Sequence, residues 1–197
     1  EGLAAHRACG FHTSRWAADF LACCADEEVA APATFVAPLG PDRADLAASL
    51  ASDAGRAATA ALDAEIGDRA FVVRVDRIEL SKNVLRAFDA FDALLAARPD
   101  LHERVVFGAF VYPSRLGVAA YDRYREAVVA RVAEINARFA TPGWTPIVWD
   151  ADDDHPRSMA ALARADVVVV NPIRDGLNLV AKEAALLNDR HARLVLS

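Results

Sequence analysis

The sequence predicts an α/β fold in which a parallel sheet is flanked by helices, and three observations support this class. Strand-like apolar runs alternate with helix-like segments along most of the chain, a pattern typical of parallel strands joined by right-handed crossovers. The four valines at 167–170 lead through Asp175-Gly176 into a helix-compatible segment, which indicates a buried strand, a turn and a helix start. The 197 residues, 54% of them hydrophobic, suffice for a packed core.

The first third of the chain is the least regular. Residues 8–12 form a short predicted strand, after which Thr13 or Ser14 is suited to cap a helix. Residues 34–37 form a second apolar piece. The alanine-rich run 45–66 is mostly helical by propensity.

The alternation becomes regular after a composition shift at Gly67-Asp68-Arg69. Short apolar runs predict strands at 70–75, 104–111, 147–150, 166–170 and 193–196. Amphipathic or helix-compatible segments predict helices at 81–97, 116–139, 157–163 and 178–188. Because an open sheet of this kind normally continues into another helix, we expect the sequence to be cut short after its last strand.

Composition and charge exclude several classes of protein. The formal net charge of −6 argues against a general nucleic-acid binder, so any anion site must be local. The three cysteines, Cys9, Cys23 and Cys24, lack metal-ligand spacing, which favours a reduced cytoplasmic protein. The start of the chain does not read as a signal peptide, and we expect no membrane span.

The corner after the valine run is the first candidate site. Asp175-Gly176 supplies the turn and Asn178 is suited to cap the next helix, whose N-terminus would offer free N–H groups to an anion. Glu183 follows about one and a half turns into that helix, where its carboxylate could reach sugar or ribose hydroxyls. A purely electrostatic role for Glu183 near the helix start is the alternative.

Two further corners carry cations. Arg77 lies in the loop after the predicted strand 70–75, and Lys82 lies at the next helix start. Such a pair suits a diphosphate, although solvated surface charges are the plain alternative. Arg115 occupies a third corner, in Pro113-Ser114-Arg115, and there too an ordinary polar loop is the alternative.

Motifs for metals and phosphate loops are not evident. The acidic run Asp150–His155 lacks the alternating positions, glycine and distant glutamate of a calcium loop, which favours a solvated loop. Neither G-x-G-x-x-G nor G-x-x-x-x-G-K occurs. Phosphate binding would therefore use a helix terminus and cations.

Five blocks in order resemble the trehalose-6-phosphate synthase family of retaining glycosyltransferases. They are GFHTSRWAADFL (10–21), VDRIELSKN (75–83), YPSR (112–115), INARFATPGWTPI (135–147) and NPIRDGLNLVAKE (171–183). The resemblance implies a chain with most of the donor-binding half of an enzyme of two Rossmann-like domains (GT-B). Residues 1–65 would be the end of the acceptor-side domain and its connection, and 66–197 a donor domain truncated at its C-terminus.

The resemblance also implies roles for individual residues. Arg77 and Lys82 correspond to the catalytic pair that holds the donor diphosphate and stabilises the leaving group, and Arg115 to an arginine on the acceptor phosphate. The residues implied in donor binding are Asp175, Gly176, Leu177, Asn178, Leu179, Val180 and Glu183.

The reaction so implied moves glucose from a UDP- or GDP-linked donor to glucose 6-phosphate with retention and gives trehalose 6-phosphate. No cofactor or metal is implied, and no nucleic acid or membrane partner. The missing remainder of the enzyme is an expected partner, a homo-oligomer is left open, and we expect the chain alone to be inactive.

Departures from the family pattern leave alternatives open. Glu79-Leu80, Asn83 and Asn171-Pro172-Ile173 resemble a branch that includes pseudo-glycosyltransferases, which couple a nucleotide-linked cyclitol to an aminocyclitol phosphate. A noncatalytic protein that binds nucleotide sugar is the third reading.

Overall fold

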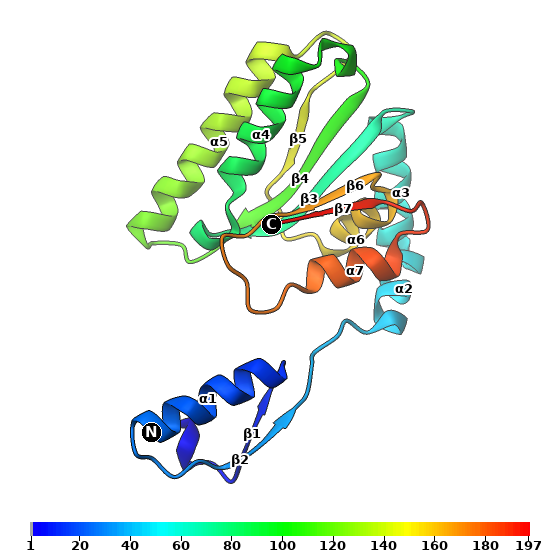
Figure 1. The fold of residues 1–197 in the computed structure, drawn as a ribbon. Helices are drawn as coiled ribbons and strands as arrows, with labels where there is room; N and C mark the ends of the chain where they lie inside the picture. The colour runs from blue at the N-terminus through cyan, green and yellow to red at the C-terminus, as the bar shows by residue number, and fades with distance from the viewer. Residues whose placement is uncertain (1) are drawn as a thin grey trace. The chain divides into compact units, whose positions relative to one another are not determined.

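Figure 1 shows the fold in a computed structural model, which describes residues 2–197. The chain forms two compact units, one that ends at Pro41 and one that runs from Asp42 to Ser197. Among the helices of the described residues, none combines the length and apolar character that crossing a bilayer requires.

The first unit is a small strand–helix–strand motif. After a short 3-10 helix, η1 (Leu3–Ala5), strand β1 (Ala8–Phe11) pairs in parallel with β2 (Ala33–Val36), and helix α1 (Ser14–Asp26) connects them. The Thr13 side chain accepts a hydrogen bond from the Trp16 N–H at 3.2 Å, so that Thr13 is the N-cap. The predicted strand and helix are thereby confirmed.

The second unit contains a five-stranded parallel sheet of order β5-β4-β3-β6-β7. Its strands are β3 (Ala70–Ile78), β4 (Val105–Pro113), β5 (Ile147–Asp150), β6 (Val167–Val170) and β7 (Arg193–Leu196). The predicted α/β class with a parallel sheet is confirmed.

Helices cover both faces of this sheet (Figure 1). Helices α4 (Val84–Ala97) and α5 (Ala119–Phe139) pack together on one face. The other layer contains α2 (Arg43–Ala51), α3 (Asp53–Ile66), α6 (His155–Arg164) and α7 (Leu179–Leu187). Short 3-10 helices, η2 (Leu80–Lys82) and η3 (Pro99–Leu101), flank α4.

The core lies around the two long central strands. Phe107 of β4 meets the rings of Phe88 and Phe91 of α4 edge-on, with centroids 5.5 and 5.3 Å apart. On the other side of β4, Phe110 meets Phe71 of β3 at 6.4 Å. Gly108 leaves room for this packing, because a Cβ there would lie 2.6 Å from the Phe71 ring.

Several element bounds differ from those expected. Strand β3 extends to Ile78, so Arg77 lies in the strand and not in a loop. Helix α4 starts at Val84, because Asn83 has a left-handed backbone (φ 59°) that separates it from η2, which contains Lys82. The run 45–66 is two helices, interrupted where Ser52 caps α3 by accepting from the Gly55 N–H.

The division into units also differs from the expected boundary at 65/66. Helices α2 and α3 pack on α6 and belong to the second unit, so the division falls between Pro41 and Asp42. The assignment of the units to acceptor-side and donor domains stays a prediction.

The strand order defines where a ligand is expected. From β3 the chain proceeds to β4 and β5 on one side, and later returns to the other side of β3 for β6 and β7. The crevice outside the carboxyl ends of β3 and β6 is therefore the topological switch point, where ligands bind in open α/β sheets.

Candidate functional site

Lys82 and Asp175 meet at the carboxyl ends of β3 and β6. The Lys82 ammonium lies 2.7 Å from an Asp175 carboxylate oxygen and 3.2 Å from one of Asp76. The exposed fraction of the Lys82 side chain is only 13%. Two residues that the sequence placed on separate corners are therefore joined by a direct ion pair, 93 positions apart in the chain.

The charge state of Lys82 follows from these contacts. Burial by itself lowers the pKa of Lys82, but the hydrogen bonds and charges of Asp175 and Asp76 outweigh it, and the pKa lies above its ordinary value. For Asp175, burial opposes ionisation, but the hydrogen bonds from Lys82 and Asn178 prevail and its pKa is lowered. Both groups are therefore charged at neutral pH.

Sequence reasoning missed Arg74, whose guanidinium is completely buried beside this pair. Arg74 Nη2 lies 3.1 Å from Asp76 Oδ2, while the other Asp76 oxygen faces Lys82. We call Arg74, Asp76, Lys82 and Asp175 the four-charge cluster. The available signal was the pair of charged residues two positions apart in the apolar strand 70–78, which places both side chains on one face.

The β6–α7 corner has the expected cap. Asn178 Oδ1 accepts from the Ala181 N–H at 3.0 Å, and its amide donates to Asp175 at 3.0 Å. Asp175 also accepts from the Leu177 N–H at 3.3 Å. Leu179 and Val180 form the first turn of α7, where backbone N–H groups have no partner within the helix. The cap therefore fixes Asp175 beside a helix N-terminus.

Arg77 and Arg115 lie at the neighbouring corners. Arg77 Nη1 pairs with Glu79 at 2.8 Å, and half of the Arg77 side chain is exposed. The same Glu79 oxygen accepts from Ser114 Oγ at 3.0 Å, which ties the β3 corner to the β4 corner. Arg115 follows with a left-handed backbone (φ 50°), and its guanidinium lies over the Tyr121 ring at 5.2 Å.

Glu183 is half-buried on α7. Burial raises the pKa of its carboxyl, and the charge of His155 opposes that shift. Burial also raises the pKa of Tyr112 at the end of β4, with contributions from Asp153 and Glu183. Burial is the largest cause of both shifts.

The acidic run Asp150–His155 has structural partners. Asp150 pairs with Arg157 at 2.6 Å, and Asp154 caps α6 by accepting from the Arg157 N–H at 3.0 Å. Within residues 2–197, no group of three or more His, Cys, Asp or Glu side chains is arranged to hold a metal ion.

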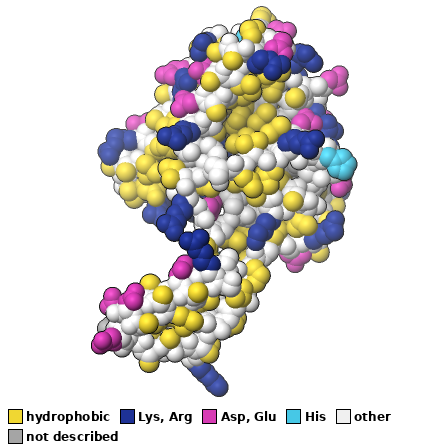
Figure 2. All heavy atoms as spheres, in the orientation of Figure 1, with side chains coloured by type: hydrophobic (Ala, Val, Ile, Leu, Met, Phe, Trp, Pro, Cys, Tyr) yellow, Lys and Arg dark blue, Asp and Glu magenta, His cyan; other side chains and the backbone are white. Residues whose placement is uncertain are grey.

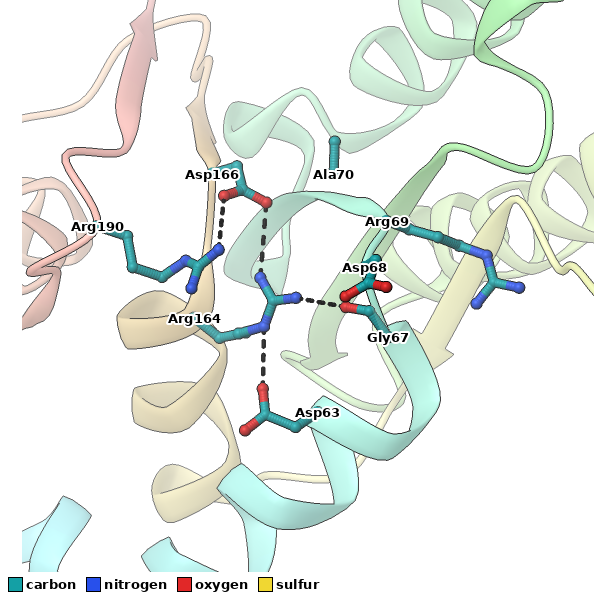
Figure 3. A pocket seen from close by; sticks show the side chains of 8 residues that line it. All are labelled: Asp63, Gly67, Asp68, Arg69, Ala70, Arg164, Asp166 and Arg190. Carbon is teal, nitrogen blue, oxygen red and sulfur yellow. Dashed lines mark hydrogen bonds and ion pairs between the residues drawn. The ribbon is translucent and has the colours of Figure 1, made fainter.

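A charged cavity of about 610 Å³ lies at the opposite edge of the sheet (Figure 3). Arg164 enters it between Asp63 at 3.0 Å and Asp166 at 3.6 Å, and also donates to the Gly67 carbonyl at 2.8 Å. Arg190 pairs with Asp166 at 3.3 Å. These charges neutralise one another at the amino ends of β3 and β6, away from the switch point.

The face of the second unit that is seen in Figure 2 carries charges of both signs. Figure 2 shows basic, acidic and apolar side chains interspersed over its visible face.

The fold and this edge define a Rossmann-like α/β protein of GT-B type, with cations, carboxylates and a helix N-terminus at its switch point. The chain belongs to glycosyltransferase family 20, whose family model matches residues 1–197.

The chain is similar in sequence to known synthases. It is 30% identical to the alpha,alpha-trehalose-phosphate synthase (UDP-forming) of Schizosaccharomyces pombe; the matched region makes up 95% of this chain and 39% of that relative. The bifunctional trehalose-6-phosphate synthase/phosphatase of Thermoproteus tenax is 37% identical over 67% of this chain and 18% of its own length.

Solved structures match as well. A UDP-forming trehalose-phosphate synthase from Burkholderia vietnamiensis superposes with a TM-score of 0.87 at 30% identity, over 98% of this chain and 45% of that one. An Escherichia coli structure described as bound with UDP-2-fluoro glucose gives 0.83 at 28%, over 97% and 45%. This chain therefore spans less than half the length of these relatives.

Proposed function

We propose that this chain holds the nucleotide-sugar donor of a retaining glycosyltransferase at the carboxyl ends of β3 and β6. The observation that carries the proposal is the Lys82–Asp175 contact of 2.7 Å, which joins the two corners at the switch point of the sheet. The resemblance between this chain and structures of trehalose-phosphate synthases, one described as bound with UDP-2-fluoro glucose, supports it.

In this proposal Arg77 and Lys82 bind the donor diphosphate. Arg77 is half exposed and can offer two N–H groups to phosphate oxygens, while Lys82 supplies a point charge. As the bond between the sugar and the diphosphate breaks, negative charge grows on the leaving oxygen. Cations already fixed at that place stabilise this charge without having to reorganise.

The α7 side binds the sugar and the ribose. Asp175 accepts hydrogen bonds from hydroxyls of the donor sugar, and the corner from Gly176 to Val180 directs N–H groups at phosphate oxygens. Leu177, Asn178 and Leu179 contribute through their backbones. The Glu183 carboxylate accepts from the vicinal ribose hydroxyls, a role that requires its ionised form.

The acceptor is glucose 6-phosphate, with Arg115 as one of the groups on its phosphate. A Burkholderia xenovorans synthase described as in complex with glucose-6-phosphate, which matches this chain with a TM-score of 0.84 at 26% identity, supports this choice. The acceptor hydroxyl attacks the face that the diphosphate leaves, its proton passes to the departing diphosphate, and trehalose 6-phosphate forms with retention.

Because this chain covers 45% of a solved relative, the complete enzyme in this proposal includes further chain that helps to bind the acceptor. The remainder of the enzyme is the proposed partner of this chain. The protein side chains named above carry the donor diphosphate, and we assign no step to a metal ion. The free cysteines Cys9, Cys23 and Cys24 favour a cytoplasmic location.

Isothermal titration of UDP-glucose and of GDP-glucose into this chain tests donor binding and identifies the base. We expect saturable binding of one of the two at a single site. A turnover assay with glucose 6-phosphate, on the longer natural chain, tests the transfer itself. If the longer chain binds the donor but makes no trehalose 6-phosphate, the proposed reaction is wrong while the donor site stands.

A further inference from the structure

We propose that Arg74 is a positioning residue whose buried charge keeps Lys82 available to the donor diphosphate. The inference rests on the proposed function of this edge and assigns a role to a residue that does not itself reach the ligand. Arg74 is completely buried on β3, three residues before Arg77.

The first argument is the charge balance of the four-charge cluster. Arg74 contacts one oxygen of Asp76 at 3.1 Å, Lys82 contacts the other at 3.2 Å, and Lys82 also contacts Asp175 at 2.7 Å. Two cations and two carboxylates therefore sum to zero. Without Arg74 the cluster would carry a net charge of −1 at the place where a diphosphate must bind.

Burial strengthens the effect of the Arg74 charge on its neighbours. Burial raises the pKa of Asp76, and the charges of Arg74 and Lys82 oppose that shift without cancelling it. Because the four side chains are largely buried away from water, the Coulomb interactions between them are stronger than on an exposed surface. Arg74 therefore shares the Asp76 carboxylate with Lys82, one cation on each oxygen.

The second argument is geometric. Arg74 donates to the Lys82 carbonyl and to the Asn171 side chain, so one guanidinium contacts both corners. The same corners are joined by Asn83 Nδ2 to the Asn171 carbonyl at 3.1 Å and by the Ile173 N–H to the Ser81 carbonyl at 2.8 Å. The planar fork of an arginine can serve such divergent acceptors together.

A purely structural role is the competing explanation. Buried ion pairs often contribute little net stability, because desolvation offsets their attraction. A structural role predicts that substitution of Arg74 alters folding stability, with no dependence of ligand affinity on the charge of Asp76. The two roles therefore differ in what a second substitution at Asp76 does.

The test is isothermal titration of UDP into the wild-type chain, Arg74→Met and the double variant Arg74→Met/Asp76→Asn. A net charge of −1 is expected to weaken UDP binding about tenfold or more in the single variant. The double variant restores a neutral cluster and is expected to recover most of that loss.

Arg164→Met is the matched control, because Arg164 is also a largely buried arginine between carboxylates, but at the amino edge of the sheet. It is expected to lower the melting temperature without weakening UDP binding. Arg74→Lys, which retains the charge, covers the case in which Arg74→Met does not fold. It is expected to bind UDP more tightly than Arg74→Gln.

The outcomes separate the two proposals. If the folded wild-type chain does not bind UDP, the donor site is wrong and the role of Arg74 falls with it. If the wild type binds but Arg74→Met binds equally well, or the double variant binds no better than the single one, only the role of Arg74 is overturned. If Arg74→Met does not fold, equal binding by Arg74→Lys and Arg74→Gln overturns it.

Discussion

Lys82 is shared between two carboxylates, so a diphosphate that binds there must compete with Asp175 for the ammonium. Asp175 is the more accessible of the two, with 19% of its side chain exposed against 6% for Asp76. Donor binding is therefore expected to displace Asp175 from Lys82. The Lys82 ammonium can then contact the diphosphate, and the Asp175 carboxylate can accept from sugar hydroxyls.

Lys82→Met tests the ammonium directly. Because a charge-assisted hydrogen bond contributes about 1.5–3 kcal/mol, the affinity for UDP is expected to fall at least about tenfold. Titrations of UDP and UMP provide the comparison, since the loss should be greater for the ligand with two phosphates. An equal or smaller loss for UDP would place the ammonium away from the diphosphate.

Glu183→Gln tests the half-buried carboxyl through stability and binding together. The pKa of Glu183 is raised by burial, so its contribution to stability is present below its ordinary pKa and is lost as pH rises through the raised value. Thermal unfolding should show the variant more stable than wild type near pH 7, with the difference vanishing near about pH 4.

UDP-glucose binding should change in the opposite direction in Glu183→Gln, because a neutral amide accepts less strongly from ribose hydroxyls. In wild type, binding should weaken as the pH falls through the raised pKa of Glu183. A variant that is less stable at neutral pH and binds normally would contradict both statements.

The sequence located the corner residues better than the buried residues behind them. Asp175 and Asn178 lie at the predicted corner before α7, and Lys82 lies in η2, just before α4, while their roles in ligand binding stay predictions. The contact of Arg74 with Asn171 joins positions 97 apart, and no local pattern encodes it. Glu79 is similar, because its bond to Ser114 depends on the register between β3 and β4.

Helices α7 and α3 each begin at a side-chain N-cap. Asn178 caps α7 and Ser52 caps α3, each by accepting from an N–H three residues on. Only the first cap lies at the switch point. The Ser52 cap is therefore expected to stabilise the fold alone, and the Asn178 cap to stabilise the fold and also support the proposed donor site.

Asn178→Ala and Ser52→Ala form a matched pair that separates these effects. Each is expected to reduce the free energy of unfolding by about 1 kcal/mol, the usual effect of losing an N-cap. Denaturant unfolding measures that loss, and UDP titration should show weaker binding for Asn178→Ala only. Equal affinities in the two variants would remove Asn178 from the donor site.

Element type was predictable and element ends were less so. Apolar periodicity located the strands and long helices of the second unit, since burial of one face imposes that pattern. The left-handed backbone of Asn83 and the cap at Ser52 shifted the ends, because both depend on contacts or conformations that composition does not reveal. Arg77 lies in β3 rather than after it, because β3 stays paired with β4 as far as Ile78.

For the whole molecule, the strand order gives these residues a common location. Strand order could not be read from the sequence, which predicted a parallel sheet without saying which strands are neighbours. The observed order sets β6 beside β3 and so brings together two corners from distant parts of the chain.

The chain spans less than half of the solved relatives reported above, and we expect it to bind a donor without turning it over. Incubation with UDP-glucose and glucose 6-phosphate, followed by mass detection of trehalose 6-phosphate, checks this. Product from the purified chain in excess of an Arg77→Ala control would show that these residues already contain a working acceptor site.

The central claim is that the donor diphosphate binds at the carboxyl ends of β3 and β6, and Arg77 tests it most directly. Calorimetric titration of UDP-glucose should give saturable binding to the wild-type chain and at least about tenfold weaker binding to Arg77→Ala. Arg98→Ala, which removes an arginine of similar exposure (57% against 51% for Arg77) that pairs with Asp100, should bind like wild type. Equal affinities in all three folded proteins, or no binding at all, would contradict the account.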